Sequence, residues 1–492
     1  MGKQLKVLFM SPEAVPFAKT GGLGDVAGSL PPALRRLGVD VRVVLPLYTM
    51  VKGSGAEMRL ICEDLKVPLG DSLLTARIWE AQSAENTPIY LVEREDLYSR
   101  PNLYGTTAGD YYDNLERFSF YSHAALLLAG EISFRPDLIH CHDWQSGLVP
   151  ALVRGPYRRS AWVGKARTVF TIHNLGYQGI FSPEKLRLTG LSPEEYFHME
   201  GLEYWGKISL LKAGMVYADM ITTVSPTYAK EIQTGSYGLG MEGILRQRKS
   251  VLFGLLNGVD YGIWDPAHDT HLPANYSARK MSGKGDCKEA LIKEMGLDPA
   301  LVNRPLLGVI SRLDAQKGID LLVAALPDIL ALDAGVVILG SGEASIQEAL
   351  RKAARDNPGR VGLTIGFNDP LAHRIMGGAD VFLIPSRYEP CGLTQMYALR
   401  YGTVPVVRAT GGLDDTIVPF HRESGDGNGF KFSAYQPQAL LSAIRDAVDL
   451  FSEAKNWEKL QANGMKSDFS WDRSARSYLE LYKSALEPER TG

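Results

Sequence analysis

The sequence predicts an α/β protein with two doubly wound, Rossmann-like domains that face each other across a cleft. Short β-branched runs alternate with helical patterns through most of the chain, and this alternation is typical of parallel sheets covered by helices on both faces. The alternation starts again after a polar, turn-rich stretch at 265–288. A chain of 492 residues is also longer than a single domain usually is, so we expect two large domains.

The predicted elements form two series along the chain. The first opens with a buried strand at 5–10, a glycine turn and a helix at 26–37, and its later strands are expected at 39–45, 138–141, 168–172, 220–224 and 251–256. The strands of the second are expected at 306–310, 336–339, 361–365, 381–384 and 404–407. We therefore expect domains at 1–260 and 261–470, followed by a helical C-terminal segment at 471–492.

The composition narrows the range of functions. The net charge is −3, so we expect no basic field that would hold nucleic acid or an acidic membrane surface. No apolar stretch approaches the length of a membrane span, and we expect no secretory or transit segment before the first strand. The four cysteines are scattered without metal-ligand spacing, which fits a reducing compartment. These features predict a cytoplasmic protein.

A glycine-rich motif, Lys19–Asp25, follows the first predicted strand. Glycine lets the backbone approach a ligand, the start of the next helix favours anions, and Lys19 adds a positive charge toward phosphate. The alternative is a turn that only connects strand and helix. The motif lacks the Gly-Lys-Ser/Thr of phosphate-loop NTPases and the glycine spacing of dinucleotide-binding proteins, which disfavours a nicotinamide dehydrogenase.

A second motif, Ser311–Gly318, follows the first strand of the second domain. Arg312 offers a planar fork and Lys317 a compact charge, so both cations can converge on one diphosphate. The alternative is a solvated loop with two surface charges.

A third motif, Glu389–Gln395, follows the strand expected at 381–384. We expect the run Gly392–Thr394 to open a helix whose free backbone N–H groups point toward a ligand. The carboxylate of Glu389 is placed to accept hydrogen bonds from sugar hydroxyls. A capping acid on an ordinary helix is the alternative.

Histidines mark the ends of two strands of the first domain. His140 and His142 precede Asp143 on one strand, and His173 follows the next. Three histidines suggest a metal, but no acidic cluster supports one, so we expect none. Because neighbouring parallel strands end at the same edge of a sheet, Asp143 and His173 are expected to converge on a substrate.

With these motifs in this order, the sequence resembles bacterial glycogen synthases and the related plant starch synthases over nearly its whole length. The combination of Lys19–Asp25 with Glu389–Gln395 is the most specific part of the match. The resemblance implies a GT-B type glycosyltransferase that transfers glucose from ADP-glucose to the non-reducing end of an α-1,4-glucan such as glycogen. It further implies retention of the anomeric configuration, release of ADP, and no metal or other cofactor.

The resemblance also implies roles for individual residues. The catalytic residues it suggests are Glu389, His173, Arg312 and Lys317. The residues it suggests for substrate binding are Lys19, Gly21, Gly22, Asp25, Tyr104, Asp143, Asn257, Phe367, Cys391, Gly392, Leu393 and Thr394. Of these, Lys19, Arg312 and Lys317 are expected at the donor diphosphate, and Phe367 falls where the family often has an aromatic ring stacked on adenine. The helix at 471–486 is expected to cross back onto the first domain.

Four other interpretations remain open at this point. A glycosyltransferase that uses UDP-glucose fits the same motifs, as does a catalytically silent glucan-binding protein. A glucan phosphorylase would need a pyridoxal-bearing lysine, for which no context is visible. Intact Lys19, Arg312, Lys317 and Glu389 argue against the silent protein, and the missing glycine fingerprint argues against a dehydrogenase.

Overall fold

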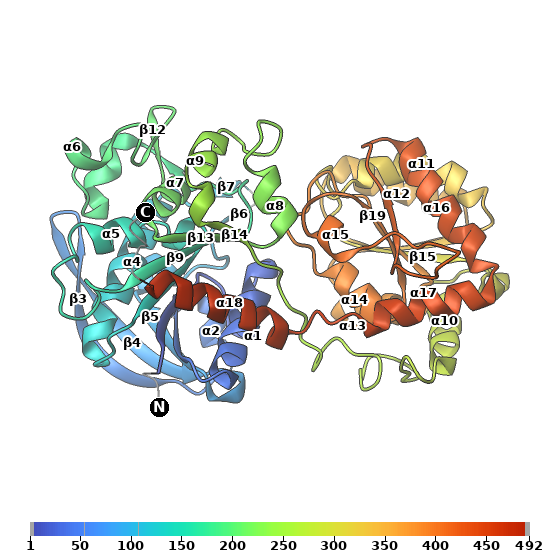
Figure 1. Ribbon diagram of the computed structural model, residues 1–492, viewed down its shortest axis with the longest axis horizontal. Coiled ribbons are helices and arrows are strands. Elements are labelled where there is room, and N and C mark those ends of the chain that lie inside the picture. Colours follow the sequence, from blue (N-terminus) through green and yellow to red (C-terminus); the bar gives the residue numbers. More distant parts are fainter. Residues whose placement is uncertain (1–3, 54, 107, 488–492) are drawn as a thin grey trace. The chain divides into compact units, whose positions relative to one another are not determined.

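The computed structural model describes residues 4–53, 55–106 and 108–487 (Figure 1). The chain folds into two compact units, 1–258 together with 471–492, and 259–470. Residues 488–492 of the predicted C-terminal segment lie outside the described residues. No helix in the described part of the chain is long and apolar enough to cross a membrane.

The first unit is built on a large twisted sheet. Among the described residues this sheet has nine strands in the order β14-β13-β9-β8-β1-β2-β5-β4-β3. All neighbours from β14 to β5 are parallel, and β4 and β3 are added antiparallel. The strands are β1 (Lys6–Met10), β2 (Asp40–Pro46), β3 (Arg59–Leu69), β4 (Ser72–Gln82), β5 (Pro88–Glu93), β8 (Leu138–His142), β9 (Arg167–Ile172), β13 (Met220–Thr223) and β14 (Leu252–Gly254).

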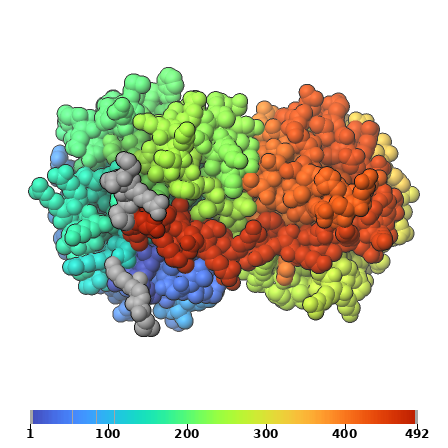
Figure 2. Space-filling model, in the orientation of Figure 1, coloured from blue at the N-terminus to red at the C-terminus, as the bar shows by residue number. Residues whose placement is uncertain are grey.

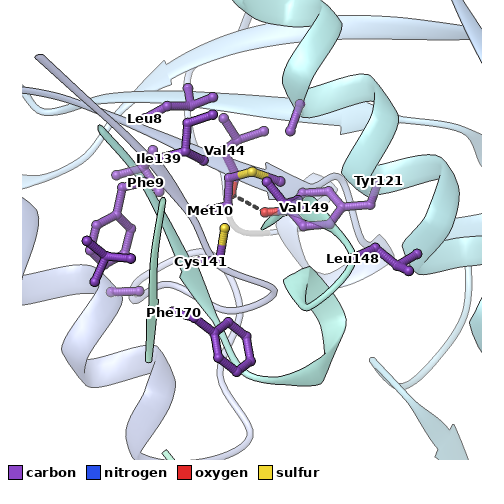
Figure 3. Packing of buried hydrophobic residues seen from close by; sticks show 14 of the residues in the cluster. Leu8, Phe9, Met10, Val44, Tyr121, Ile139, Cys141, Leu148, Val149 and Phe170 are labelled. Atoms are coloured by element: carbon purple, nitrogen blue, oxygen red, sulfur yellow. Dashed lines mark hydrogen bonds between the residues drawn. The ribbon is translucent and has the colours of Figure 1, made fainter. Parts of the chain in front are cut away.

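Helices cover this sheet, and its central strands are buried along almost their whole length, as expected for parallel strands covered on both faces. Figure 3 shows side chains of β1 and β8 packed against helix residues, with the Tyr121 hydroxyl donating to the Val44 carbonyl at 2.7 Å. The helices of the unit are α1 (Gly22–Arg36), α2 (Thr49–Lys52), α3 (Glu95–Tyr98), α4 (Asn114–Glu131), α5 (Val149–Arg154), α6 (Pro193–Tyr196), α7 (Leu210–Tyr217), α8 (Pro226–Glu231), α9 (Glu242–Gln247) and α18 (Trp471–Leu486). Two small sheets pair β6 (Gly105–Thr106) with β7 (Gly109–Asp110), and β10 (Ile180–Phe181) and β11 (Glu203–Tyr204) with β12 (Lys207–Ser209).

The second unit is a parallel sheet in the order β17-β16-β15-β18-β19-β20, with six strands among the residues described. This is the doubly wound order, in which successive strands are added first on one side of β15 and then, from β18 onward, on its other side. The strands are β15 (Leu306–Ile310), β16 (Gly335–Gly340), β17 (Val361–Ile365), β18 (Val381–Ile384), β19 (Val404–Arg408) and β20 (Phe430–Phe432). The helices are α10 (Ser282–Glu294), α11 (Ile319–Leu330), α12 (Ala344–Asp356), α13 (Asp369–Gly378), α14 (Thr394–Arg400), α15 (Gly411–Thr416), α16 (Pro437–Phe451) and α17 (Ala454–Lys466).

The C-terminal helix α18 belongs to the first unit although it follows the second in sequence. It packs beside α1, and in the space-filling view its red surface lies over that unit (Figures 1 and 2). Its inner face is buried, and the Tyr482 hydroxyl hydrogen-bonds His140 Nδ1 at 2.7 Å. The helix therefore reaches a strand that ends at the candidate site.

Several predicted boundaries were wrong. The first helix begins at Gly22 rather than at Val26, because Gly21 is extended and ends the loop before it. In the third motif the helix begins at Thr394 rather than at Gly392, whose positive φ of 70° is not helical. The strands β3, β4, β5 and β20 were not predicted. β3 and β4 alternate exposed and buried positions, so they lack the continuous apolar runs that identify central strands.

Candidate active site

The glycine motif of the first unit is held by a buried carboxylate. Glu13 lies in the loop after β1 and accepts hydrogen bonds from the Thr20 N–H at 2.6 Å and from the Gly21 N–H at 3.3 Å. It also accepts one from the Tyr104 hydroxyl at 2.7 Å. Tyr104 thus lies against the glycine turn, and burial, reinforced by the charge of Glu13, holds the pKa of its hydroxyl well above the ordinary value. Glu13 fixes the turn rather than leaving it mobile.

The predicted phosphate-binding residues lie on the open side of this turn. Lys19 Nζ pairs with Asp25 Oδ1 at 2.7 Å, and the lysine side chain is 51% exposed. The space above Gly21 is open, because a Cβ built there meets no atom within 4 Å. Gly22 is exposed and starts α1, so the backbone at 21–22 is accessible to an anionic ligand.

Asp143 and His173 do meet, as the strand order predicts. Asp143 follows β8 and takes a left-handed conformation with φ 54°. Its Oδ1 accepts a hydrogen bond from the His173 N–H at 2.7 Å. Burial raises the pKa of Asp143 to about 7, although hydrogen bonds from the backbone N–H groups of His173 and Asn174 oppose the shift. This carboxyl group therefore titrates near neutral pH.

The histidines form a buried chain behind these residues. His173 Nε2 hydrogen-bonds His142 Nδ1 at 2.9 Å, and His140 hydrogen-bonds Tyr482 and Thr171. Burial lowers the pKa of His173 to about 3 and those of His140 and His142 well below the ordinary value. The rings are therefore neutral at physiological pH. Among the described residues these three rings are not part of a group of side chains placed to hold a metal ion.

Asn257 supplies a further polar group in this unit. It lies after β14 and is buried, and its Oδ1 has no hydrogen-bond partner among the described residues. An unsatisfied buried carbonyl is costly, so such an atom is a candidate for contact with a ligand hydroxyl.

The site of the second unit lies where its strand order reverses. A cavity of about 140 Å³ is lined by the ends of β15 and β18 together with Lys317, Glu389 and Thr394. Ligands of doubly wound sheets bind at this switch point. A larger and more open hollow of about 480 Å³ over Arg351, Arg355 and Thr364 contains none of the predicted residues. We therefore assign the chemistry to the smaller cavity.

An ion pair occupies this cavity. Lys317 Nζ lies 2.6 Å from Glu389 Oε2, and the two side chains are 21% and 9% exposed. Ser386 Oγ donates to the same carboxylate oxygen at 2.9 Å. Arg312 pairs with Asp314 at 2.8 Å and donates to Gln316, and its side chain is 54% exposed. The structure thus joins Lys317 to Glu389 across 72 residues of sequence, whereas Arg312 remains solvent-accessible.

Close backbone packing positions the rest of the third motif. A Cβ on Gly412 would lie 2.1 Å from the Cys391 carbonyl oxygen, so only glycine lets α15 approach this loop. Gly392 has φ 70°, a conformation that favours glycine, and turns the chain into α14. Cys391 is buried, while Gly392, Leu393 and Thr394 line the cavity.

Phe367, the predicted base-stacking residue, lies between β17 and α13 and is 92% exposed. An aromatic ring without a packing role in its own domain is available to a planar ligand.

Three supporting residues were missed from the sequence. Glu13, His142 and Ser386 contact predicted site residues directly. His142 lies inside a motif that was recognised, and Ser386 lies three residues before Glu389 of another, so their position was a usable signal. Glu13 carries no such signal, because its role depends on how the loop after β1 folds back on the turn.

The comparisons with known proteins agree with this arrangement. Residues 6–247 match the family model for the starch synthase catalytic domain, and residues 299–463 match glycosyl transferases group 1. A glycogen synthase of Anaeromyxobacter sp. (strain Fw109-5) is 49% identical over 98% of this chain and 100% of its own length. A glycogen synthase of Syntrophotalea carbinolica is 45% identical over 98% of this chain and 99% of its own.

A solved structure extends the likeness to three dimensions. The catalytic domain of starch synthase IV from Arabidopsis thaliana, bound to ADP and acarbose, superposes with a TM-score of 0.91 at 34% identity, covering 98% of this chain and 100% of that one. Sucrose-phosphate synthase from Thermosynechococcus elongatus, at 18% identity and a TM-score of 0.60, shares the fold. The chain is therefore a GT-B glycosyltransferase and belongs to the glycogen and starch synthase family.

Proposed function

We propose that this enzyme transfers glucose from ADP-glucose to the non-reducing end of an α-1,4-glucan, with retention of configuration and release of ADP. The observation that carries the proposal is the Lys317–Glu389 pair, held by Ser386 in the cavity at the switch point. A cation beside a carboxylate suits a ligand that has a diphosphate next to a sugar.

The second unit would bind the donor. Lys317 and the exposed Arg312 supply positive charge for the diphosphate, and the backbone at 392–394 approaches the same ligand. Glu389 would accept hydrogen bonds from the glucose hydroxyls, and the exposed ring of Phe367 would stack on the base. The ADP bound to the related starch synthase supports an adenine nucleotide here.

Transition-state stabilisation would come mainly from these charges. Negative charge grows on the diphosphate as the glycosidic bond breaks, and preorganised cations stabilise it without reorganisation. The sugar then resembles an oxocarbenium ion. We propose that the acceptor hydroxyl attacks from the face that the diphosphate leaves and gives its proton to the departing phosphate. This route needs neither a protein nucleophile nor a metal ion.

The first unit would bind the glucan acceptor, and its Lys19 would contribute to donor binding. His173 is neutral and Asp143 titrates near pH 7, so both offer hydrogen bonds to sugar hydroxyls without a fixed charge. The unpartnered Oδ1 of Asn257 would accept another. Lys19 would reach the donor phosphates from the glycine turn.

Two exposed aromatic side chains of the first unit support a glucan acceptor. Tyr177 is 55% exposed and Trp205 is 81% exposed. Trp205 has φ 51° in the two-residue turn between β11 and β12, where a bulky residue is disfavoured. The Tyr204 hydroxyl donates to the Leu239 carbonyl at 2.6 Å and braces this turn. Strain of this kind often marks functional positions, and flat rings suit the apolar faces of sugars.

We also propose a cytoplasmic location. The four cysteines, Cys62, Cys141, Cys287 and Cys391, form no disulfide bonds, and cysteines stay reduced in a reducing compartment.

The deciding experiment compares kcat/KM for radiolabelled ADP-glucose and UDP-glucose with glycogen as acceptor. We expect a clear preference for ADP-glucose and label in α-1,4-linked product. A preference for UDP-glucose would overturn the donor assignment. Glycogen binding without transfer from either donor would identify a catalytically silent homologue.

A further inference from the structure

A second group of chemically active side chains lies in the second unit, apart from the cavity described above. It consists of His271 in the loop before α10, Asp369 at the first position of α13, and His373 one turn later. Each offers one ligand atom, and these atoms all lie within 4.8 Å of one another. His373 Nε2 lies 3.9 Å from Asp369 Oδ2. In residues 4–53, 55–106 and 108–487 no other His, Cys, Asp and Glu side chains meet this criterion.

We propose that His271, Asp369 and His373 form a binding site for a divalent transition-metal ion of the zinc class. Two imidazoles and one carboxylate match the ligands that zinc takes from proteins, and three protein ligands leave a fourth position for water. Imidazole ligands favour zinc, nickel and copper over magnesium and calcium, which prefer oxygen.

A buried carboxylate orients the ring of His373 and anchors the backbone at His271. Asp269 Oδ2 accepts hydrogen bonds from His373 Nδ1 at 2.7 Å and from the Tyr401 hydroxyl at 2.5 Å. Asp269 Oδ1 accepts one from the His271 N–H at 2.8 Å. Because the Nδ1–H of His373 donates a hydrogen bond to Asp269, Nε2 carries the lone pair of the neutral ring and faces Asp369. This carboxylate–histidine arrangement is the usual support for a metal-binding imidazole.

Aromatic packing fixes the ring of His373 as well. Trp264 stacks on it with ring centroids 3.9 Å apart and an angle of 7°. Trp264 also stacks on Tyr397, with ring centroids 4.1 Å apart. His373 is therefore held by the Trp264 ring and by its hydrogen bond to Asp269 before any ion arrives, and Trp264 lies close enough to report on an ion by its fluorescence.

The remaining ligands are free to close on an ion. Tetrahedral zinc with ligand bonds of about 2.1 Å keeps its ligand atoms about 3.4 Å apart, so the largest separation in the group must shorten by up to about 1.4 Å. Asp369 is able to move because its side chain is 53% exposed, and His271 is only partly buried. A bound ion would tie the loop that carries His271 to α13.

This site is independent of the glucosyl-transfer proposal. None of its three ligands is a predicted site residue, and the ion would act on stability rather than on the reaction. Phe367 lies two residues before Asp369 in sequence, so donor kinetics are a useful separate readout.

The test is isothermal titration of chelator-treated full-length protein with Zn²⁺, paired with thermal unfolding. We expect one equivalent bound per chain, a rise in Tm of at least about 3 °C at saturation, and visible d–d absorption when Co²⁺ is used instead. His271→Gln and Asp369→Asn should each weaken binding at least tenfold, while their transfer activity in metal-free buffer should equal that of the wild type. Both leave the buried His373–Asp269 pair intact, so folding is preserved.

His268→Gln is the matched control, because His268 is an exposed histidine on the same loop. It should bind Zn²⁺ like the wild type. If His271→Gln and Asp369→Asn also bind like the wild type, or if no Tm shift accompanies binding, the proposed site is wrong and the ion is held by other surface groups.

Discussion

Buried ionisable side chains carry different charges in the candidate sites of the two units. In the first unit, burial keeps the imidazole of His173 neutral and raises the pKa of Asp143 to about 7. In the second unit, Lys317 and Glu389 are also largely shielded, but they face each other at 2.6 Å. A buried ion pair keeps both charges, whereas an isolated buried group tends to lose its charge.

This difference matches the chemistry proposed for each unit. Neutral groups bind sugar hydroxyls without attracting counterions, and paired charges stabilise a departing diphosphate. Variants that change charge alone should therefore act on different properties in the two units. Such variants in the second unit should lower the catalytic rate, and those in the first unit should change how stability depends on pH.

The largest effect is expected for Glu389→Gln, which keeps the shape of the side chain and removes its charge. We expect kcat and kcat/KM to fall together by about 10³-fold, because the lost contact acts mainly in the transition state. Donor binding measured by titration should be largely preserved. Glu294→Gln also removes a paired carboxylate, in this case one that pairs with Arg374, and it should retain wild-type rates.

Mass spectrometry of the intact protein distinguishes positioning by Glu389 from covalent catalysis. The enzyme is allowed to react with ADP-glucose and a slow acceptor, and the reaction is then quenched. We expect no glucosyl adduct on either wild type or Glu389→Gln. Azide should also fail to rescue Glu389→Ala. A glucosyl group mapped to Glu389 would establish a double displacement instead.

Asp143→Asn should remove a pH dependence of stability. The folded-state pKa of Asp143, about 7, lies above its ordinary value of 3.8. Between these values the folded protein holds a proton that the unfolded chain has lost, so this residue lowers stability as pH rises. Relative to Asp143→Asn, the wild type should lose about 2–3 kcal/mol of unfolding free energy between pH 5 and pH 7.5 in urea titrations. Parallel curves for the two proteins would show that the Asp143 carboxyl titrates outside this window.

Lys19→Gln tests whether the glycine turn of the first unit contacts the donor phosphates. We expect the donor KM to rise or turnover to fall by tenfold or more, equivalent to about 1.4 kcal/mol. Lys66→Gln is the control, because Lys66 is similarly exposed at 54% and also pairs with an aspartate. If Lys19→Gln shows the same kinetics as the control, Lys19 does not contact the donor phosphates.

Trp205→Ala tests one of the two exposed aromatic side chains of the first unit. We expect the glycogen KM to rise about threefold while the donor KM stays constant, because the ring would contact only the acceptor. Tyr112→Ala removes a comparably exposed ring, 85% exposed, and should leave both values unchanged. A rise in the donor KM for Trp205→Ala would contradict an acceptor role.

The smallest effect is expected for Cys391→Ser. Cys391 lies beside the cavity but has no chemical role in the proposal, so at least about half of the activity should remain. Bulky thiol reagents should inhibit the wild type, and ADP-glucose should protect it. Cys62→Ser removes the most accessible of the four thiols, so inhibition that persists in this background is due to a buried cysteine. Complete loss of activity in folded Cys391→Ser would reveal a direct role.

The sequence by itself determined the central strands and the main motifs. Parallel strands buried on both faces leave long apolar runs, and β15, β17 and β18 have the predicted bounds. Because ligands bind beyond the carboxyl ends of such strands, the motifs that follow them were recognisable as well. The antiparallel strands β3 and β4 escaped prediction because exposed positions interrupt their apolar pattern.

Only the tertiary structure decided which side chains pair and which carry charge. Lys317 and Glu389 are far apart in sequence and meet because β15 and β18 are neighbours in the sheet. Glu13 became visible as the support of the glycine turn only through its contacts. The pKa values of Asp143 and His173 depend on desolvation, which is a property of the packed fold and not of the local sequence.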